Sequence, residues 1–281
     1  IDTQQCWRDL KKNGGPGSIA EQLATANIDV LLGGGMAFFN QRVEMNEPNQ
    51  PTILDKALSH GHHLMKTEEE LLTQTGQTKL LGLFAKKHLP VEWIGTHNQR
   101  AKKIETDRQG HPIFPESFSC QQNPKHKGIP KLAEMTKKAL QALSHNNNIG
   151  FFLMVEGASI DKQAHKRDPC GQIGELRAFD KAVSVARQFA AQHPNTLIIV
   201  TADHGHAGQV VPLPENYQAS GSNAFMAHYS TGHYAILKTL SGELMATNYA
   251  TNSSPGGQWE MHTGINVPAF IEGPGLENIP A

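Results

Sequence analysis

Two stretches of this 281-residue chain indicate its fold: Val-Glu-Gly-Ala-Ser-Ile-Asp-Lys-Gln-Ala-His at 155–165 and Thr-Ala-Asp-His-Gly-His at 201–206. The hydrophobic runs at 151–155 and 197–202 lead into them and are typical of buried parallel strands. Both groups of acidic and histidine side chains are therefore expected just beyond strand carboxyl ends, where open α/β sheets bind ligands. The sequence thus predicts an α/β fold with a polar site at one edge of its sheet.

These stretches carry side chains of metal-binding types at Glu156, Asp161, His165, Asp203 and His204. Asp161 and His165 are four residues apart, so on a helix they share one face and can close on a single ion. Carboxylate oxygen and imidazole nitrogen are both ligands of zinc. A carboxylate is costly to bury after an apolar strand, which favours a cation near Glu156 and Asp203. The alternatives are a solvated helical pair at 161 and 165, and a simple cap or turn at Asp203-His204.

The surrounding pattern alternates helices and strands. Ser18 with Glu21, and Thr67 with Glu70, are capping signatures that predict two helix starts. The spacing of apolar residues predicts one helix after Pro130 and a longer one after Cys170. The strand at 151–155, the helix after Cys170 and the strand at 197–202 would form a right-handed βαβ unit.

The two polar stretches and Glu-Met-His-Thr-Gly at 260–264 resemble the signature segments of bacterial alkaline phosphatases. The likeness runs from about Cys6 to about Gly275. It includes Gly-Ser-Ile-Ala-Glu-Gln-Leu (17–23), Asp-Val-Leu-Leu-Gly-Gly-Gly (29–35) and Leu-Gly-Leu-Phe-Ala (81–85). The resemblance implies a three-layer α/β/α sandwich in which 1–281 is the C-terminal part of one phosphatase domain. A small β-rich, crown-like lobe is expected as an insertion at 209–258.

The resemblance also implies a role for each polar side chain. Asp161, His165 and His262 would bind one zinc ion, Asp203 and His204 a second, and Glu156 magnesium. Lys162 would approach the phosphate through water. His206 would contact a metal-binding side chain and would not bind the metal ion itself. The complete protein is expected to hydrolyse phosphate monoesters through a phosphoserine intermediate, as a homodimer.

Several parts of the family's active site are not found among these 281 residues. They are the Asp-Ser-Ala-type segment with the nucleophilic serine, a metal-bridging aspartate, an Asp-x-Thr segment and a phosphate-clamping arginine. In the family they lie upstream of the segment that matches residue 6, so the chain resembles the C-terminal portion of a longer protein and is expected to be inactive alone. A zinc-binding chain without turnover, and a related sulfatase or phosphodiesterase, stay open as alternatives.

The three cysteines bear on the cellular compartment. Cys120 and Cys170 match positions that are bridged in enterobacterial members of the family, whereas the partner expected for Cys6 would lie upstream. A disulfide would indicate an oxidising compartment, so the protein is expected to be periplasmic or secreted. The alternative is a pair of buried thiols.

Composition excludes some partners. A formal net charge of −1 argues against nucleic-acid binding. No apolar run approaches the roughly 18 to 20 residues of a membrane-spanning helix, so no membrane partner is expected. His60, His62 and His63 form a second histidine group, but no carboxylate or cysteine lies near them at ligand spacing.

Overall fold

The computed structural model describes residues 17–43, 49–76, 79–213, 217–218, 221, 223, 231–250 and 253–276. They belong to two compact units. The first comprises Ile1–Pro90 and Lys125–Val155, and the second comprises Val91–Pro124 and Glu156–Ala281. Cys6 lies outside the described residues. Within the described part of the chain, no helix has the length and apolar character needed to cross a membrane.

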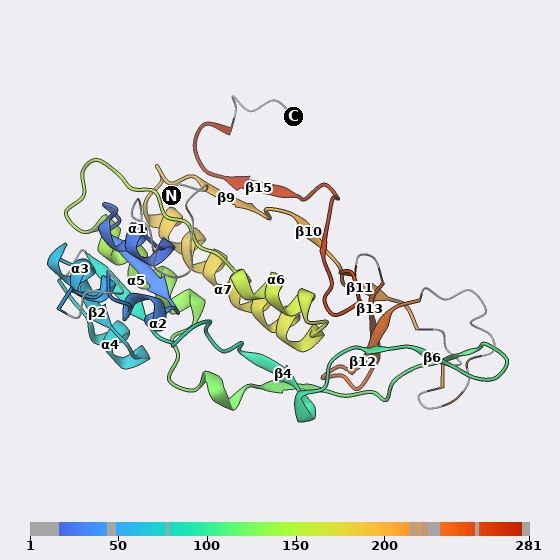
Figure 1. The fold of residues 1–281 in the computed structure, drawn as a ribbon. Coiled ribbons are helices and arrows are strands. Elements are labelled where there is room, and N and C mark those ends of the chain that lie inside the picture. The colour runs from blue at the N-terminus through green and yellow to red at the C-terminus, as the bar shows by residue number, and fades with distance from the viewer. Residues whose placement is uncertain are drawn as a thin grey trace. The chain divides into compact units, whose positions relative to one another are not determined.

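The first unit is built around a parallel three-stranded sheet (Figure 1). Its strands are β1 (Val30–Gly33), β2 (His63–Met65) and β3 (Leu80–Leu83), in the order β1-β3-β2. β1 lies within the stretch at 29–35 that resembles the family. Because side chains alternate along a strand, Leu81 and Leu83 pack on one face of the sheet and Leu80 on the other.

Helices cover both faces of this sheet. They are α1 (Ile19–Thr25), α2 (Met36–Phe39), α3 (Ile53–Ser59), α4 (Glu68–Thr73) and α5 (Leu132–Ser144). Side chains of α1, α2 and α3 form one buried cluster with Leu81 and Leu83, and those of α4 and α5 form another with Leu80. The first unit therefore has helix, sheet and helix layers, the arrangement expected for an α/β/α sandwich.

Two of these helix starts follow from their capping residues. The predicted capping box at Thr67 and Glu70 begins α4, with both reciprocal hydrogen bonds present. At α1 only half of the box forms. The Ser18 hydroxyl accepts from Glu21 N over 3.2 Å, while the Glu21 carboxylate accepts from Lys56 Nζ over 2.7 Å.

Two histidines of the group at 60–63 contact backbone oxygens of the first unit. His62 is buried, and its Nδ1 and Nε2 lie 3.1 Å from Ala57 O and 2.9 Å from Ile28 O. His60 Nδ1 lies 2.8 Å from Lys56 O. Because these ring nitrogens are engaged by backbone carbonyls, the group forms no metal cluster among the residues that are described.

The second unit contains a helical hairpin made of α6 (Ala158–His165) and the long α7 (Pro169–Gln192). Asp168 caps α7 by accepting from Gly171 N over 3.0 Å, and burial raises the pKa of its carboxyl group. The pair β4 (Trp93–Gly95) and β8 (Cys120–Gln122) lies beside α7. A Cβ at Gly174 would lie 2.6 Å from Trp93 Cβ, so glycine permits this close packing.

A disulfide and a β-rich lobe complete this part of the second unit. The structure joins Cys120 to Cys170, the pair that the family resemblance implies. The lobe is a four-stranded sheet in the order β11-β13-β12-β5, and all its pairings are antiparallel. Its strands are β11 (Gln209–Val211), β12 (His233–Lys238), β13 (Leu244–Tyr249) and β5 (Lys102–Lys103). The sheet thus includes one strand from outside 209–258.

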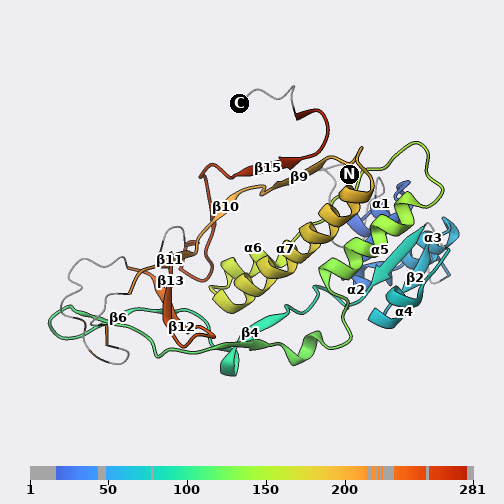
Figure 2. The same ribbon diagram turned by 180° about the vertical axis from the view of Figure 1, so that it is seen from behind.

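The prediction of two buried parallel strands at the site is wrong. Phe151–Val155 is not a strand, and the side chain of Phe152 is 89% exposed. The strand β9 (Ile198–Thr201) does form, but it pairs antiparallel with β15 (Ala269–Glu272), as Figures 1 and 2 both show. The predicted βαβ unit is therefore absent from the described structure. An apolar run becomes a strand only when another strand pairs with it, and no strand of the described chain pairs with 151–155.

Candidate metal centre

Four side chains of the second unit bring possible metal ligands together. They are Asp161, His165, His206 and His262, whose ligand atoms all lie within 4.8 Å of one another. Asp161 and His165 come from adjacent turns of α6, as their four-residue spacing predicts. His206 ends β10 (Gly205–His206) and His262 begins β14 (His262–Thr263). Segments separated by about 40 to 100 residues of sequence thus converge on one site.

Three of these atoms form a nearly equilateral triangle. Asp161 Oδ1 lies 3.2 Å from His165 Nε2 and 3.2 Å from His262 Nε2, and the two nitrogens are 3.1 Å apart. Ligands about 2.0–2.1 Å from a tetrahedral zinc ion are about 3.3 Å from one another. The triangle therefore has the dimensions of one face of a zinc coordination sphere.

The Asp161 carboxylate supports a cation at this point. Its Oδ1 atom is buried and has no hydrogen-bond partner among the described residues, although three imidazole nitrogens lie within 3.2 Å of it. A buried carboxylate oxygen without a hydrogen bond is unfavourable unless a positive charge compensates it. The donor set and its unpaired oxygen thus fit a zinc ion.

Hydrogen bonds determine which nitrogen of His165 faces the cluster. His165 Nδ1 lies 2.5 Å from the backbone oxygen of Glu260. A carbonyl oxygen only accepts hydrogen bonds, so Nδ1 carries the ring proton and donates it. In the neutral ring Nε2 then presents its lone pair to the cluster, the tautomer that binding a metal through Nε2 requires.

His206 has the opposite tautomer. Its Nδ1 accepts a hydrogen bond from Ala207 N over 2.8 Å, so Nε2 carries the proton of the neutral ring. Burial and the neighbouring His165 imidazole lower the pKa of His206 to about 4, which keeps the ring neutral at pH 7. His206 Nε2 lies 3.2 Å from Asp161 Oδ1, although the two atoms are not hydrogen-bonded to each other. His206 is thus better suited to contact Asp161 than to bind a metal ion.

Asp203 and His204 lie beside this cluster. His204 Nε2 is 3.4 Å from Asp203 Oδ2 and 3.8 Å from Asp161 Oδ1, and its ring stacks on His262 with centroids 3.6 Å apart. His204 Nδ1 donates to Gly205 O over 3.0 Å, which leaves Nε2 as the acceptor. The Asp203 side chain is 86% exposed. These two residues form a separate pair of possible ligands, open on one side.

The other two predicted residues lie along the same segment. Glu156 is exposed and precedes α6 by two residues, outside the four-residue cluster. Lys162 follows Asp161 on α6 and is partly buried. The structure therefore brings together the three side chains expected to bind the first zinc ion, whereas Glu156 is left on the surface.

The pairing of β10 with β14 positions His262. These strands are antiparallel, with His206 opposite His262 and Gly205 opposite Thr263. A Cβ at Gly205 would lie 2.3 Å from Ile265 Cγ1 and 2.7 Å from Thr263 Oγ1. A larger residue at 205 would therefore have to displace the Ile265 and Thr263 side chains, so Gly205 contributes to the site by leaving them room.

Two charged residues next to the candidate ligands are not among those that the sequence indicates. Arg167 and Glu260 form a buried ion pair, and each lies two residues from a candidate ligand. Glu260 begins the signature segment at 260–264, but its pairing with Arg167 cannot be read from local sequence because the two residues are 93 positions apart. Only the folded structure reveals this contact.

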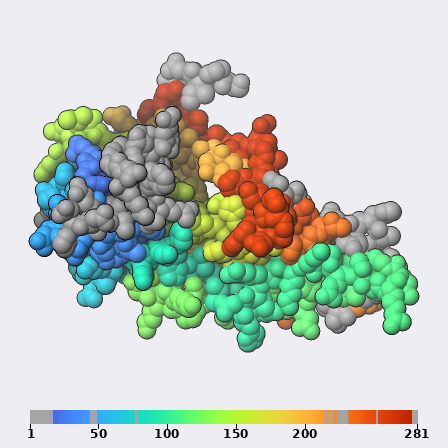
Figure 3. Space-filling view, viewed as in Figure 1, coloured from blue at the N-terminus to red at the C-terminus, as the bar shows by residue number. Residues whose placement is uncertain are grey.

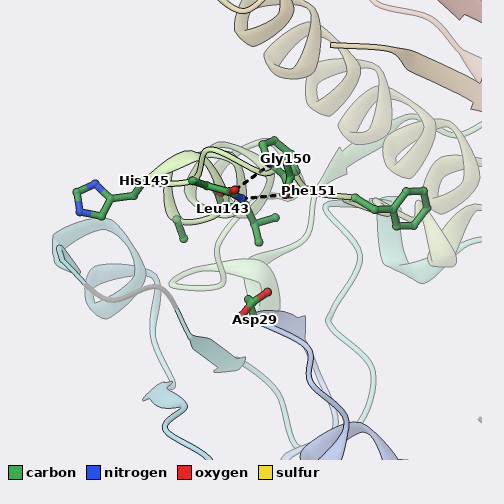
Figure 4. Close-up of a pocket in the computed structure, with 8 residues that line it drawn as sticks. Asp29, Leu143, His145, Gly150 and Phe151 are labelled. Atoms are coloured by element: carbon green, nitrogen blue, oxygen red, sulfur yellow. Dashed lines mark hydrogen bonds between the residues drawn. The ribbon is translucent and has the colours of Figure 1, made fainter. Parts of the chain in front are cut away.

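A hollow elsewhere in the molecule is a separate feature. It lies in the first unit, has a volume of about 240 Å³ and is lined in part by Asp29, His145 and Phe151 (Figure 4). Asn147 shapes its wall by donating to Leu143 O and to Gly150 O, each over 2.9 Å. Ligand-type side chains converge at the Asp161 cluster instead, and we place the chemistry there.

Comparison with known proteins identifies the family. The family model described as Alkaline phosphatase matches residues 2–280. The chain belongs to the alkaline phosphatase family. Its match to streptomycin-6-phosphate phosphatase of Streptomyces griseus has 38% identity over 283 residues, 97% of this chain and 57% of that protein. Its match to the Escherichia coli (strain K12) alkaline phosphatase has 37% identity over 281 residues, 99% of this chain and 54% of that protein.

Solved structures agree on the fold. The alkaline phosphatase from the Antarctic bacterium TAB5 matches with a TM-score of 0.55 and 21% identity, covering 92% of this chain and 57% of that one. The Thermus thermophilus alkaline phosphatase matches with a TM-score of 0.51 and 29% identity, covering 68% of this chain and 34% of that one. The α/β fold of the alkaline phosphatase type is therefore confirmed. The chain spans about half the length of the curated relatives it matches.

Proposed function

We propose that this chain carries the metal-binding portion of an enzyme that hydrolyses phosphate monoesters with zinc and magnesium. The observation that carries the proposal is the triangle of Asp161 Oδ1, His165 Nε2 and His262 Nε2, with its unpaired carboxylate oxygen. Three protein ligands are the number that an open catalytic zinc site has, with the fourth position free for substrate or water. Membership of the alkaline phosphatase family supports phosphate as the group transferred.

The remaining site residues have distinct roles in this proposal. Asp203 and His204 provide two ligands of a second zinc ion, and Glu156 provides one oxygen ligand for magnesium, which takes carboxylates and water. His206 orients the Asp161 carboxylate, and Lys162 on α6 contacts the phosphate through water. When bound, the metal ions stabilise the charge on the attacking and leaving oxygens of an in-line displacement.

The nucleophile is the part of the reaction that these 281 residues do not supply. In the complete protein, a serine on the family's Asp-Ser-Ala-type segment attacks phosphorus and forms a phosphoserine intermediate. The bridging aspartate, the Asp-x-Thr segment and the arginine of the family complete the second zinc site, the magnesium site and the phosphate clamp. The residues of this chain hold the metal ions.

The proposal includes assembly and location. The complete protein is a homodimer in which the β-rich lobe at 209–258 lies near the subunit interface, and it is periplasmic or secreted. The Cys120–Cys170 disulfide supports an oxidising compartment, where such bonds persist.

One set of assays separates the proposed function from its rivals. The chain, alone and joined to the family's nucleophile-bearing segment, is loaded with zinc and magnesium and given chromogenic phosphate monoester, phosphate diester and sulfate ester substrates. Hydrolysis of the monoester by the joined form supports the proposal. Preference for the diester or the sulfate would favour a related phosphodiesterase or sulfatase. Zinc binding without turnover in either form would favour a zinc-binding chain.

A further inference from the structure

A buried ion pair connects the two segments that carry the zinc ligands. Arg167 lies two residues after His165, and Glu260 lies two residues before His262. Arg167 Nε donates to Glu260 Oε1 over 2.6 Å, and the two side chains are only 11% and 0% exposed. In Figure 3, red residues from the C-terminal part of the chain lie against yellow-green residues, the colour of α6. The ion pair thus fastens the end of α6 to the start of β14.

Further hydrogen bonds hold both charges in place. Arg167 Nη2 donates to Gly257 O over 2.6 Å. The Ser253 hydroxyl lies 3.1 Å from Oε1 and 3.2 Å from Oε2 of Glu260. Because both partners are pinned by additional contacts, the pair has the geometry that a buried salt bridge needs to offset its desolvation.

The backbone of Glu260 also contacts the first zinc-ligand segment directly. Glu260 N donates to His165 O over 3.1 Å, and Glu260 O accepts from His165 Nδ1. The second contact fixes the His165 tautomer that leaves Nε2 free. A shift of residue 260 would therefore turn the His165 ring and move His262 at the same time.

We propose that Arg167 and Glu260 are positioning residues that hold His165 and His262 at the distances one zinc ion requires. This inference rests on the proposed function, because it takes the Asp161 triad to be a zinc site. Neither side chain is a ligand, and both act through the backbone of residue 260. Partners of this kind around a metal site typically change metal affinity by roughly 10- to 100-fold when removed.

Variants of the ion pair distinguish a positioning role from a role limited to fold stability. Arg167→Met or Glu260→Gln leaves one member of the pair without its partner, so each lowers both stability and zinc affinity. Arg167→Met/Glu260→Gln removes both charges and leaves no unpaired buried charge. We expect this double variant to regain much of the melting temperature of the metal-free chain while its zinc affinity stays roughly 10- to 100-fold below that of the unmodified chain.

The experiment has two readouts. Competition with a chelator measures zinc affinity, and the visible absorption spectrum of Co²⁺ bound in place of zinc reports the geometry of the ligands. Arg187→Met is the control, because Arg187 forms an ion pair of 2.7 Å with Glu272 that is exposed on the same unit. The control is expected to leave both readouts unchanged. The double variant is expected to alter the Co²⁺ spectrum.

Two results would overturn the inference in different ways. If the double variant bound zinc and Co²⁺ as the unmodified chain does, the ion pair would be structural only, and the proposed function would stand. If the unmodified chain bound neither ion, the zinc site itself would be wrong, and the positioning role would fall with it.

Discussion

His206 and His262 lie opposite each other in the antiparallel pair β10–β14, with ring centroids 5.3 Å apart, yet their surroundings favour different roles. Ala207 N donates to His206 Nδ1, which leaves the proton of that ring on Nε2. His262 Nε2 faces His165 Nε2 at 3.1 Å. Register alone makes the two histidines equivalent, and hydrogen bonding distinguishes them.

The first prediction tests this distinction. His262→Ala removes a ligand, so we expect zinc affinity to fall by more than the roughly 10- to 100-fold loss expected for His206→Ala. Titration calorimetry with zinc measures both. His193→Ala is the control, because His193 stacks on Phe189 at the end of α7, away from the cluster. An equal or larger loss in His206→Ala would mean that His206 is itself a ligand.

The second prediction concerns the close approach of β10 and β14. Gly205→Ala would place a Cβ 2.3 Å from Ile265 Cγ1, and we expect a loss of about 1–3 kcal/mol of stability together with weaker zinc binding. Gly264→Ala is the matched control, because a Cβ there meets nothing within 4 Å. Thermal unfolding and zinc titration of both variants check the prediction. Equal stability of the two variants would show that the strands relax easily.

The parts of the site that sequence reasoning could predict are those determined locally. Asp161 and His165 are one helical turn apart, so their convergence follows from α6 alone. The run Phe151–Val155 failed as a strand prediction because its conformation depends on a pairing strand, which its own residues do not specify. Likewise, the Arg167–Glu260 pair depends on a contact that only the folded chain creates, whereas the role expected for His206 comes from the family resemblance.

The third prediction concerns the disulfide. Material from an oxidising compartment should yield a linked Cys120–Cys170 peptide when mapped without reductant. The bond spans 50 residues, so Cys120→Ser/Cys170→Ser should lose roughly 4 kcal/mol of stability in the chain-entropy model. Denaturant unfolding with and without reductant measures this loss. Two free thiols in such material would contradict the prediction.

The last prediction is that the 281 residues alone hydrolyse phosphate monoesters no faster than background. A phosphoryl-transfer site without its nucleophile and arginine loses both covalent catalysis and stabilisation of transition-state charge. The chain should nevertheless bind zinc through Asp161, His165 and His262. We therefore expect the chain alone to bind the metal without hydrolysing the ester. Ester hydrolysis is measured with added zinc and magnesium, first for the chain alone and then with the family's upstream segment supplied in trans or as a fusion. His262→Ala in the fusion serves as the control that ties restored activity to this zinc site. Robust turnover by the chain alone, lost in His262→Ala, would mean that a metal-bound hydroxide replaces the serine, and the phosphoserine mechanism would have to be abandoned.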